Sequence, residues 1–197
     1  MKKILLISLA SISAFSQTSN IFEPIDVFDL EYISNPQISP SGDKVLYQRN
    51  FNDIMTDQSF SNIWLIDYDG NNNRPITSGN FKDNSPKWSN QGDKFLFKSN
   101  REGKSQIFLF DLNNNSIQKL TNFQYSIESI QWSPNDKYIL FSSFIDSERD
   151  TLIEMPDKPM GAKWNDPPVE ISDLNYRYDS SGFRKPGEVQ FFTIPVN

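Results

Sequence analysis

An internal repeat constrains this chain of 197 residues more than any other feature. A bulky apolar residue, a polar turn led by Ser and a second apolar run recur at residues 38–47, 88–97 and 132–141. An apolar run that ends in Asp recurs at residues 62–67 and 106–111. The copies lie 44 residues apart, except that the first two Ser turns are 50 apart, an excess interpreted as a longer loop around residues 52–60. Self-similarity at this period predicts stacked supersecondary units.

Each copy predicts four strands. The first ends at Ile38, Trp88 or Trp132; the second covers residues 44–49, 94–99 or 137–144; the third covers 63–67 or 107–111; the fourth ends at Thr77 or Thr121. Continuous apolar runs in the second and third strands indicate burial on both faces, which stacked blades provide. The fold class is therefore all-β, a partial β-propeller of four-stranded antiparallel blades, with two complete blades, part of a third, and a short N-terminal helix or signal segment.

The Ser-led polar turns contain residues that favour the backbone φ angles of a turn. Pro presets φ at the second turn position of the first and third copies, while Gly42 and Gly92 supply conformational freedom later in the turn. Asp136 takes the glycine position in the third copy, which a short side chain tolerates better than a branched one.

The third unit is interrupted. Residues 189–194 match a third strand, but they follow an insertion over residues 145–187. The predicted organisation is a signal peptide over residues 1–16, a lead-in over 17–34 and an incomplete propeller over 35–197. Because propellers close with about four to eight blades, we expect this chain to be the front part of a longer protein.

The N-terminus has the three parts of a secretory signal. Lys2 and Lys3 precede an apolar run, and small residues at Ala14 and Ser16 suit cleavage before Gln17. The sequence thus predicts an exported protein, periplasmic or extracellular, with no membrane anchor after cleavage. The alternative is a hydrophobic N-terminal strand or helix.

Composition excludes several kinds of chemistry. The chain has no Cys and no His, which rules out a disulfide framework, thiolate metal sites and a histidine-based catalytic triad within it. Its net charge of -6 disfavours a nucleic-acid partner. We expect no catalytic residue, no metal site and no cofactor. Residues 67–73 resemble a calcium loop superficially, but the Gly and Glu of an EF-hand do not fall at the required positions.

Three residues of the insertion are candidates for substrate binding. Trp164 lies off the repeat in a Pro-rich stretch, and Tyr176 and Arg177 begin a run of two aromatic residues, a cation and a carboxylate. Long insertions in compact folds are often functional, and a guanidinium can bind a carboxylate or acyl group. The alternative is a hairpin that only covers the propeller rim. Trp88 and Trp132, which share one repeat position, are interpreted as packing residues.

Two stretches carry a family resemblance, residues 28–42 and 173–183. They resemble secreted serine peptidases of the prolyl oligopeptidase family, in its acylaminoacyl-peptidase-like and dipeptidyl-peptidase-like subgroup. The resemblance implies a propeller that caps an α/β-hydrolase domain, admits only short or unfolded peptides, and is inactive alone. The expected partners are that hydrolase domain, which this sequence lacks, and a short peptide substrate. The blade repeats also resemble TolB-type propellers, so the alternative function is a non-catalytic periplasmic protein-binding module.

Overall fold

The computed structural model describes residues 21–147, 156–165, 174, 176–179 and 182–196. The expected signal peptide over residues 1–16 lies outside this range, as do parts of the lead-in and of the insertion. Within the described ranges, no helix is both long enough and apolar enough to cross a membrane.

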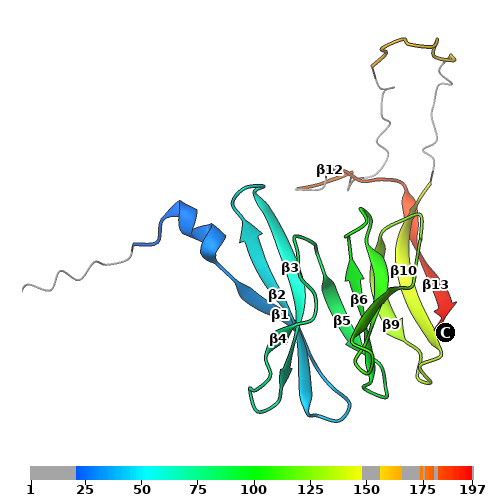
Figure 1. Cartoon of the computed structure of the whole chain (residues 1–197). Helices are drawn as coiled ribbons and strands as arrows, with labels where there is room; N and C mark the ends of the chain where they lie inside the picture. Colours follow the sequence, from blue (N-terminus) through cyan, green and yellow to red (C-terminus); the bar gives the residue numbers. More distant parts are fainter. Residues whose placement is uncertain (1–20, 148–155, 166–173, 175, 180–181, 197) are drawn as a thin grey trace, which may run out of the picture.

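Three antiparallel sheets stand side by side like the leaves of a fan (Figure 1). The first contains β1 (Tyr32–Ile38), β2 (Lys44–Asp53), β3 (Gln58–Asp67) and β4 (Arg74–Pro75). The second contains β5 (Asn84–Trp88), β6 (Lys94–Ser99), β7 (Gln106–Asp111) and β8 (Ser116–Lys119). The third contains β9 (Ile127–Trp132), β10 (Tyr138–Asp146) and β13 (Gly187–Pro195). The partial β-propeller with two four-stranded blades and part of a third is confirmed.

The predicted loop around residues 52–60 is wrong, because these residues extend a hairpin. Strand β2 continues to Asp53 and β3 starts at Gln58, with ladder pairs Asn52↔Ser59 and Asp53↔Gln58. The β2–β3 ladder has ten pairs, against six in the equivalent hairpin of the second blade. Backbone pairing needs no apolar side chain, so the mostly polar composition of these residues concealed the extension.

The fourth strands end two residues earlier than expected. They stop at Pro75 and Lys119, because Thr77 and Thr121 use their hydroxyls in place of continuing the ladder. Each hydroxyl accepts a hydrogen bond of 2.9 Å from a backbone amide in the third strand of its own sheet, that of Ile63 or Ile107. This cap therefore repeats with the blade.

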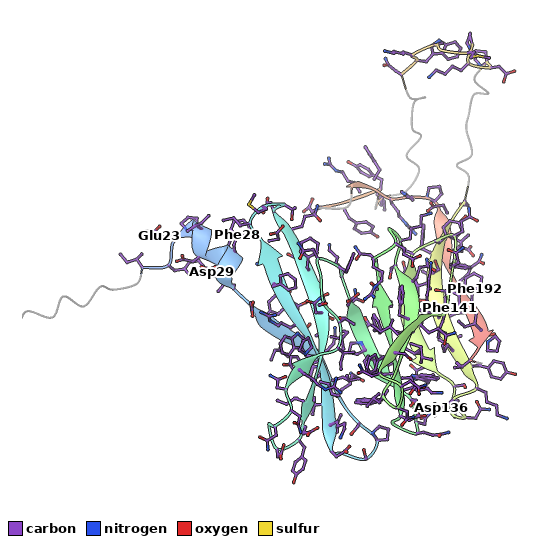
Figure 2. All side chains as sticks on the ribbon, viewed as in Figure 1. Glu23, Phe28, Asp29, Asp136, Phe141 and Phe192 are labelled. Atoms are coloured by element: carbon purple, nitrogen blue, oxygen red, sulfur yellow. The ribbon has the colours of Figure 1, made fainter. Side chains whose placement is uncertain are left out.

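Each sheet has two faces, and we call the face toward the next sheet in the chain the front face and the other the back face. Two hydrophobic cores fill the spaces between sheets. The first joins the front face of the first sheet to the back face of the second and contains Leu46, Ile63, Leu65, Phe95, Phe97, Phe108 and Phe110. The second joins the front face of the second sheet to the back face of the third and includes Leu96, Ile107, Leu109, Trp132, Ile139 and Phe141. Phe141 also stacks on Phe192 of β13, with ring centroids 5.3 Å apart (Figure 2). The predicted burial of both faces is confirmed for the middle sheet.

The Ser-led turns share one geometry. The Ser39, Ser89 and Ser133 hydroxyls each accept a hydrogen bond from the amide five residues later. In the first turn, hydrogen bonds from Ser41 and Lys44 and from Ser39 hold the pKa of the Asp43 carboxyl well below its usual range.

The glycine position of these turns has positive φ throughout, as expected, at 78° for Gly42, 76° for Gly92 and 56° for Asp136. A Cβ at residue 92 would lie 3.2 Å from Cδ of Pro40 in the preceding turn. Asp136 instead accepts hydrogen bonds from the amides of Asn90 and Gln91 in the turn before it, at 2.9 and 3.1 Å. Adjacent blades are therefore joined at this end of the molecule by contacts that differ from one pair to the next.

Candidate functional site

The two ends of the fan differ in what they carry. The Ser-led turns lie at one end, and the insertion, the β2–β3 turn and the short 3-10 helix η1 (Pro24–Asp29) lie at the other (Figure 1). All three candidate substrate-binding residues belong to the insertion. The end with the insertion is therefore the candidate functional site.

A small two-stranded hairpin forms within the insertion. Strands β11 (Arg177–Tyr178) and β12 (Gly182–Phe183) pair antiparallel. The Arg184 amide donates a 2.8 Å hydrogen bond to the Tyr176 carbonyl, and the rings of Tyr176 and Phe183 lie 6.2 Å apart. Backbone pairing and one aromatic contact thus hold together the hairpin that contains Tyr176 and Arg177.

The base of the insertion is clamped to the third sheet. Strands β10 and β13 remain paired up to Asp146 and Gly187, and the Ser147 amide donates a 3.0 Å hydrogen bond to the Pro186 carbonyl. The φ of Gly187 is +148°, and a Cβ there would lie 2.3 Å from the Ile145 carbonyl oxygen. A side chain at this position would open the clamp.

The candidate side chains face solvent. Tyr176, Tyr178 and Phe183 are about half exposed, and Trp164 is exposed to a similar degree. Tyr176 and Arg177 share the hairpin, whereas Trp164 lies on the separate described segment 156–165, which projects farther from the sheets (Figure 1). Apart from the sequence neighbours Tyr176 and Arg177, the structure therefore does not bring the candidate residues together.

The sequence analysis missed an ion pair with a buried carboxylate, formed by the residue just before β5 and a residue just after β6. Asp83 is fully buried, and Nη2 of Arg101 lies 3.0 Å from both of its carboxylate oxygens. The guanidinium also lies over the rings of Phe97 and Phe108, 5.6 and 4.8 Å from their centroids. Repeat alignment could have found the pair, because Asp83 stands where the third copy has Ile127.

The pair has a structural role. The Asp83 amide donates to the Ser61 carbonyl at 2.9 Å, and the Ser61 hydroxyl donates to the Asp83 carbonyl at 2.9 Å. Both bonds cross from the first sheet to the segment that enters the second. The Asp83 backbone thus joins the two sheets, while its carboxylate pairs with Arg101.

An open cavity of about 400 Å³ lies on the back face of the first sheet, lined by Glu31, Tyr32, Ile33, Tyr47, Arg49, Trp64 and Asn73. Arg49 pairs with Glu31 and stacks over Trp64 at 5.3 Å. The second and third sheets each pack a preceding sheet on the equivalent face. The cavity therefore lies on the face of the first sheet that corresponds to the covered back faces of the other two sheets. The described residues contain no group of three or more acidic, His or Cys side chains that could hold a metal ion.

A protein-family model matches most of the propeller strands. The model for the TolB β-propeller domain (PD40) matches residues 29–158. This chain belongs to the TolB β-propeller domain family. The match covers all of the first two blades of the propeller and the first two strands of the third.

Two relatives of the propeller are named as peptidases. Dipeptidyl-peptidase 5 of Porphyromonas gingivalis is 27% identical over 114 residues, which are 54% of this chain and 17% of that protein. The uncharacterized peptidase YuxL of Bacillus subtilis is 25% identical over 171 residues, 87% of this chain and 26% of that protein. The chain thus spans about a quarter or less of these relatives.

Solved structures agree with this fold. The acylaminoacyl peptidase of Pyrococcus horikoshii superposes with a TM-score of 0.61 and 21% identity over 86% of this chain and 24% of that one. An acylaminoacyl peptidase in complex with Z-Gly-Gly-Phe-chloromethyl ketone superposes with a TM-score of 0.62 and 20% identity. This match covers 85% of this chain and 24% of that one. The expected relationship to the propeller portion of prolyl oligopeptidase family peptidases is confirmed.

Proposed function

We propose that this chain is the N-terminal propeller portion of an exported serine peptidase that hydrolyses short peptides. In this function, the propeller covers the catalytic cavity of an α/β-hydrolase domain and limits the size of the substrates that reach it. The chain lacks His and Cys, so a histidine-based triad has to reside in that other domain.

The observation that supports this proposal most strongly is the length of the alignment with one peptidase. The alignment with the Bacillus subtilis peptidase covers 171 of the 197 residues, so it continues past the generic blade repeats into the insertion. A TolB-like binding module would account for the repeats but gives no reason for similarity to a peptidase through the insertion.

The end with the insertion offers a surface for the hydrolase domain. Helix η1 has no buried residue, and apolar side chains on it and beside it are exposed at Ile21, Phe22, Ile25, Val27 and Leu30. The helix is nevertheless held to β2, because Asn52 Nδ2 donates a 2.9 Å hydrogen bond to the Val27 carbonyl. An anchored apolar segment is suited to burial against a second domain.

The hairpin offers contacts for the peptide. Arg177 is the candidate for binding a carboxylate or acyl oxygen of the substrate, and Tyr176 for packing against a side chain. Trp164 would add a second aromatic contact from the outer segment of the insertion.

The gene provides the first test. We expect the reading frame to continue beyond Asn197 into a domain with Gly-x-Ser-x-Gly and a later His. A stop codon, with no such domain encoded nearby, would remove the peptidase proposal. In that case, capture of a stable protein partner from periplasmic extract would support the TolB-like alternative.

The full-length product provides the second test. Arg177→Ala is expected to raise KM for a short chromogenic peptide about tenfold with little change in kcat, because a charge-assisted hydrogen bond to bound substrate is lost. Arg74→Ala, on the exposed strand β4, is the matched control and should leave both constants unchanged. Unaltered KM in Arg177→Ala would exclude this residue from the binding site.

A further inference from the structure

The connection between the second and third strands is much shorter in the second blade than in its neighbours. The β2–β3 hairpin is extended in the first blade, and the insertion follows β10 in the third. Between them, residues 100–105 form a short turn at the end of the fan that carries the insertion (Figure 1). The surface beside this turn is therefore open.

An open cavity of about 540 Å³ lies at this place. The β6–β7 turn forms one side of it, and the end of β8 with the segment that leads to β9 forms the other. Its polar lining consists of two lysines, one glutamate and three side-chain amides: Lys104, Lys119, Glu102, Gln106, Asn122 and Gln124.

The side opposite the turn is held in place by a buried glutamine. Gln106 Nε2 donates a 3.0 Å hydrogen bond to the Phe123 carbonyl. Gln106 Oε1 accepts hydrogen bonds of 2.7 Å from the Phe123 amide and 2.9 Å from the Thr121 hydroxyl. Gln106 therefore fixes the segment that carries Asn122 and Gln124.

One ammonium group of the cavity has no carboxylate partner among the described residues. Lys119 forms an ion pair with Glu102, so their charges offset each other. Lys104 Nζ instead donates a 2.6 Å hydrogen bond to the Gln124 carbonyl, which is a neutral acceptor. This bond positions the ammonium and leaves two of its three N–H groups available. The cavity thus has one unmatched positive charge in a chain of net charge -6.

Two side-chain amides beside this ammonium are available as well. In the part of the chain that the structure describes, the side chains of Asn122 and Gln124 form no hydrogen bond. Each offers a donor and an acceptor, as a peptide group does. The first blade has Pro75 and Ser78 at the positions of Lys119 and Asn122, so these groups are not a general property of the repeat.

We propose that this cavity binds the C-terminal carboxylate of a peptide. Lys104 Nζ donates to the carboxylate, and the amides of Asn122 and Gln124 bond the last peptide group. A monovalent carboxylate matches the single unmatched charge, whereas a phosphate dianion would put a further negative charge beside Glu102. The carboxylate is inferred from the cavity alone, and the peptide that bears it rests on the function proposed above.

The first test compares two peptides that differ only at the C-terminus. N-acetyl-dialanine, as the free acid or as the C-terminal amide, is titrated into the isotope-labelled 197-residue chain, and the chemical shifts of the Gly103 and Asn122 backbone amides are followed by NMR. We expect the free acid to bind about tenfold or more tightly, because only the acid accepts a charge-assisted hydrogen bond. Equal affinity for the two peptides would overturn the proposal.

Three substitutions locate the preference in the cavity. Lys104→Gln removes the charge but keeps a donor for the Gln124 carbonyl, and it should abolish the preference for the free acid. Lys137→Gln is the matched control, because it makes the same change in net charge at an exposed position next to the third Ser-led turn. It should leave the preference unchanged. A preference that survived in Lys104→Gln would overturn the proposal.

Glu102→Gln has the opposite expected effect. It releases Lys119 as a second unpaired ammonium, so the free acid should bind about threefold more tightly. A merely structural role of Lys104 gives no reason for this gain, and unchanged or weaker binding would contradict the assignment. Inorganic phosphate is the third probe. If it shifted the same amides at lower concentration than the free acid does, the site would be a phosphate site and the proposal would be overturned.

The full-length product separates this inference from the peptidase function. It should hydrolyse peptides with a free C-terminus at higher kcat/KM than their amides, and Lys104→Gln should remove the difference. If it hydrolysed neither while this chain still preferred the free acid, the peptidase function would fail and the carboxylate site would stand. Equal hydrolysis of both, together with equal binding of both, would overturn the site and leave the peptidase function.

Discussion

At the scale of single residues, Gly187 shows how one missing side chain allows the insertion to leave the third sheet. Gly187→Ala would put a methyl group 2.3 Å from the Ile145 carbonyl oxygen and 2.8 Å from the Phe144 ring. We expect a loss of about 3 kcal/mol or more in the free energy of unfolding, since neither the backbone nor the packed ring can move away cheaply. Urea unfolding followed by Trp fluorescence measures it.

The control for this substitution is Gly103→Ala. Gly103 also has positive φ, at +95°, but a Cβ there would meet nothing within 4 Å. For Gly103→Ala we expect a loss in the free energy of unfolding of about 1–2 kcal/mol, which comes from backbone strain alone. Equal losses at the two positions would show that φ alone, rather than the contact with Ile145, makes Gly187 necessary.

The buried pair of Asp83 and Arg101 supports a second prediction. Asp83→Ala leaves the guanidinium facing aromatic rings without its carboxylate, and we expect it to cost about 3 kcal/mol. The double variant Asp83→Ile with Arg101→Ile copies the apolar residues of the third blade, Ile127 and Ile145, and should unfold within about 1 kcal/mol of the parent.

A double-mutant cycle that includes the single variants Asp83→Ile and Arg101→Ile measures the coupling between the two positions. If the ion pair only replaces apolar packing, the double variant should recover most of the free energy of unfolding that Asp83→Ala loses. A double variant as unstable as the single one would mean that the ion pair is required by the second blade.

At the scale of elements, the indole groups on the inner strands join consecutive blades. Trp132→Phe keeps an aromatic ring in the second core but removes the hydrogen bond to the Lys87 carbonyl. We expect a loss of about 1–2 kcal/mol, because a partly buried acceptor is left unpaired. Trp164→Phe, on the exposed outer segment, is the comparison and should change stability by less than about 0.5 kcal/mol. A neutral Trp132→Phe would restrict the role of this residue to packing.

The repeat in the sequence was sufficient to predict the blades. Apolar runs of the right length, separated by Ser-led turns, specify strands that stack on both faces, and the positive φ of Asp136 was anticipated from its place in the glycine position. Whether the insertion hairpin only covers the propeller rim or also binds a ligand stays a prediction, because the strand pairing fits both interpretations.

Contacts between blades could not be predicted in the same way. The partners in the indole hydrogen bonds are separated by 51 and 45 residues, and no local pattern marks a backbone carbonyl as an acceptor. Comparison of the repeats shows that Asp83 and Arg101 stand where the third blade has Ile127 and Ile145, but the burial of Asp83 depends on how the first two sheets pack. The extended β2–β3 hairpin was hidden by its polar rungs.

At the scale of the whole molecule, stability should decrease from the middle blade outward. The second sheet is covered on both faces and contains Phe95, Leu96 and Phe97 at 0% exposure, whereas the front face of the third sheet is open. Because blades contact only their neighbours, the end blades can open without the middle one. Amides of β7 bonded to β6 should exchange about tenfold or more slowly than amides of β13 bonded to β10.

Hydrogen exchange followed by mass spectrometry measures this gradient in the 197-residue chain. The comparison is restricted to amides that are paired within a sheet, so that differences in hydrogen bonding do not contribute. Uniform protection across the three sheets would indicate a single cooperative unit.

The contacts at the glycine position of the Ser-led turns also imply that these blades cannot be shuffled. Gly92 fits a preceding turn that contains Pro40, whereas Asp136 fits one whose amides at Asn90 and Gln91 are available to donate. A permuted gene that exchanged the second and third modules would bring Asp136 against a proline, which has no amide to offer. Duplication can create such an array from one ancestral unit, but each unit afterwards becomes adapted to the neighbour it inherited.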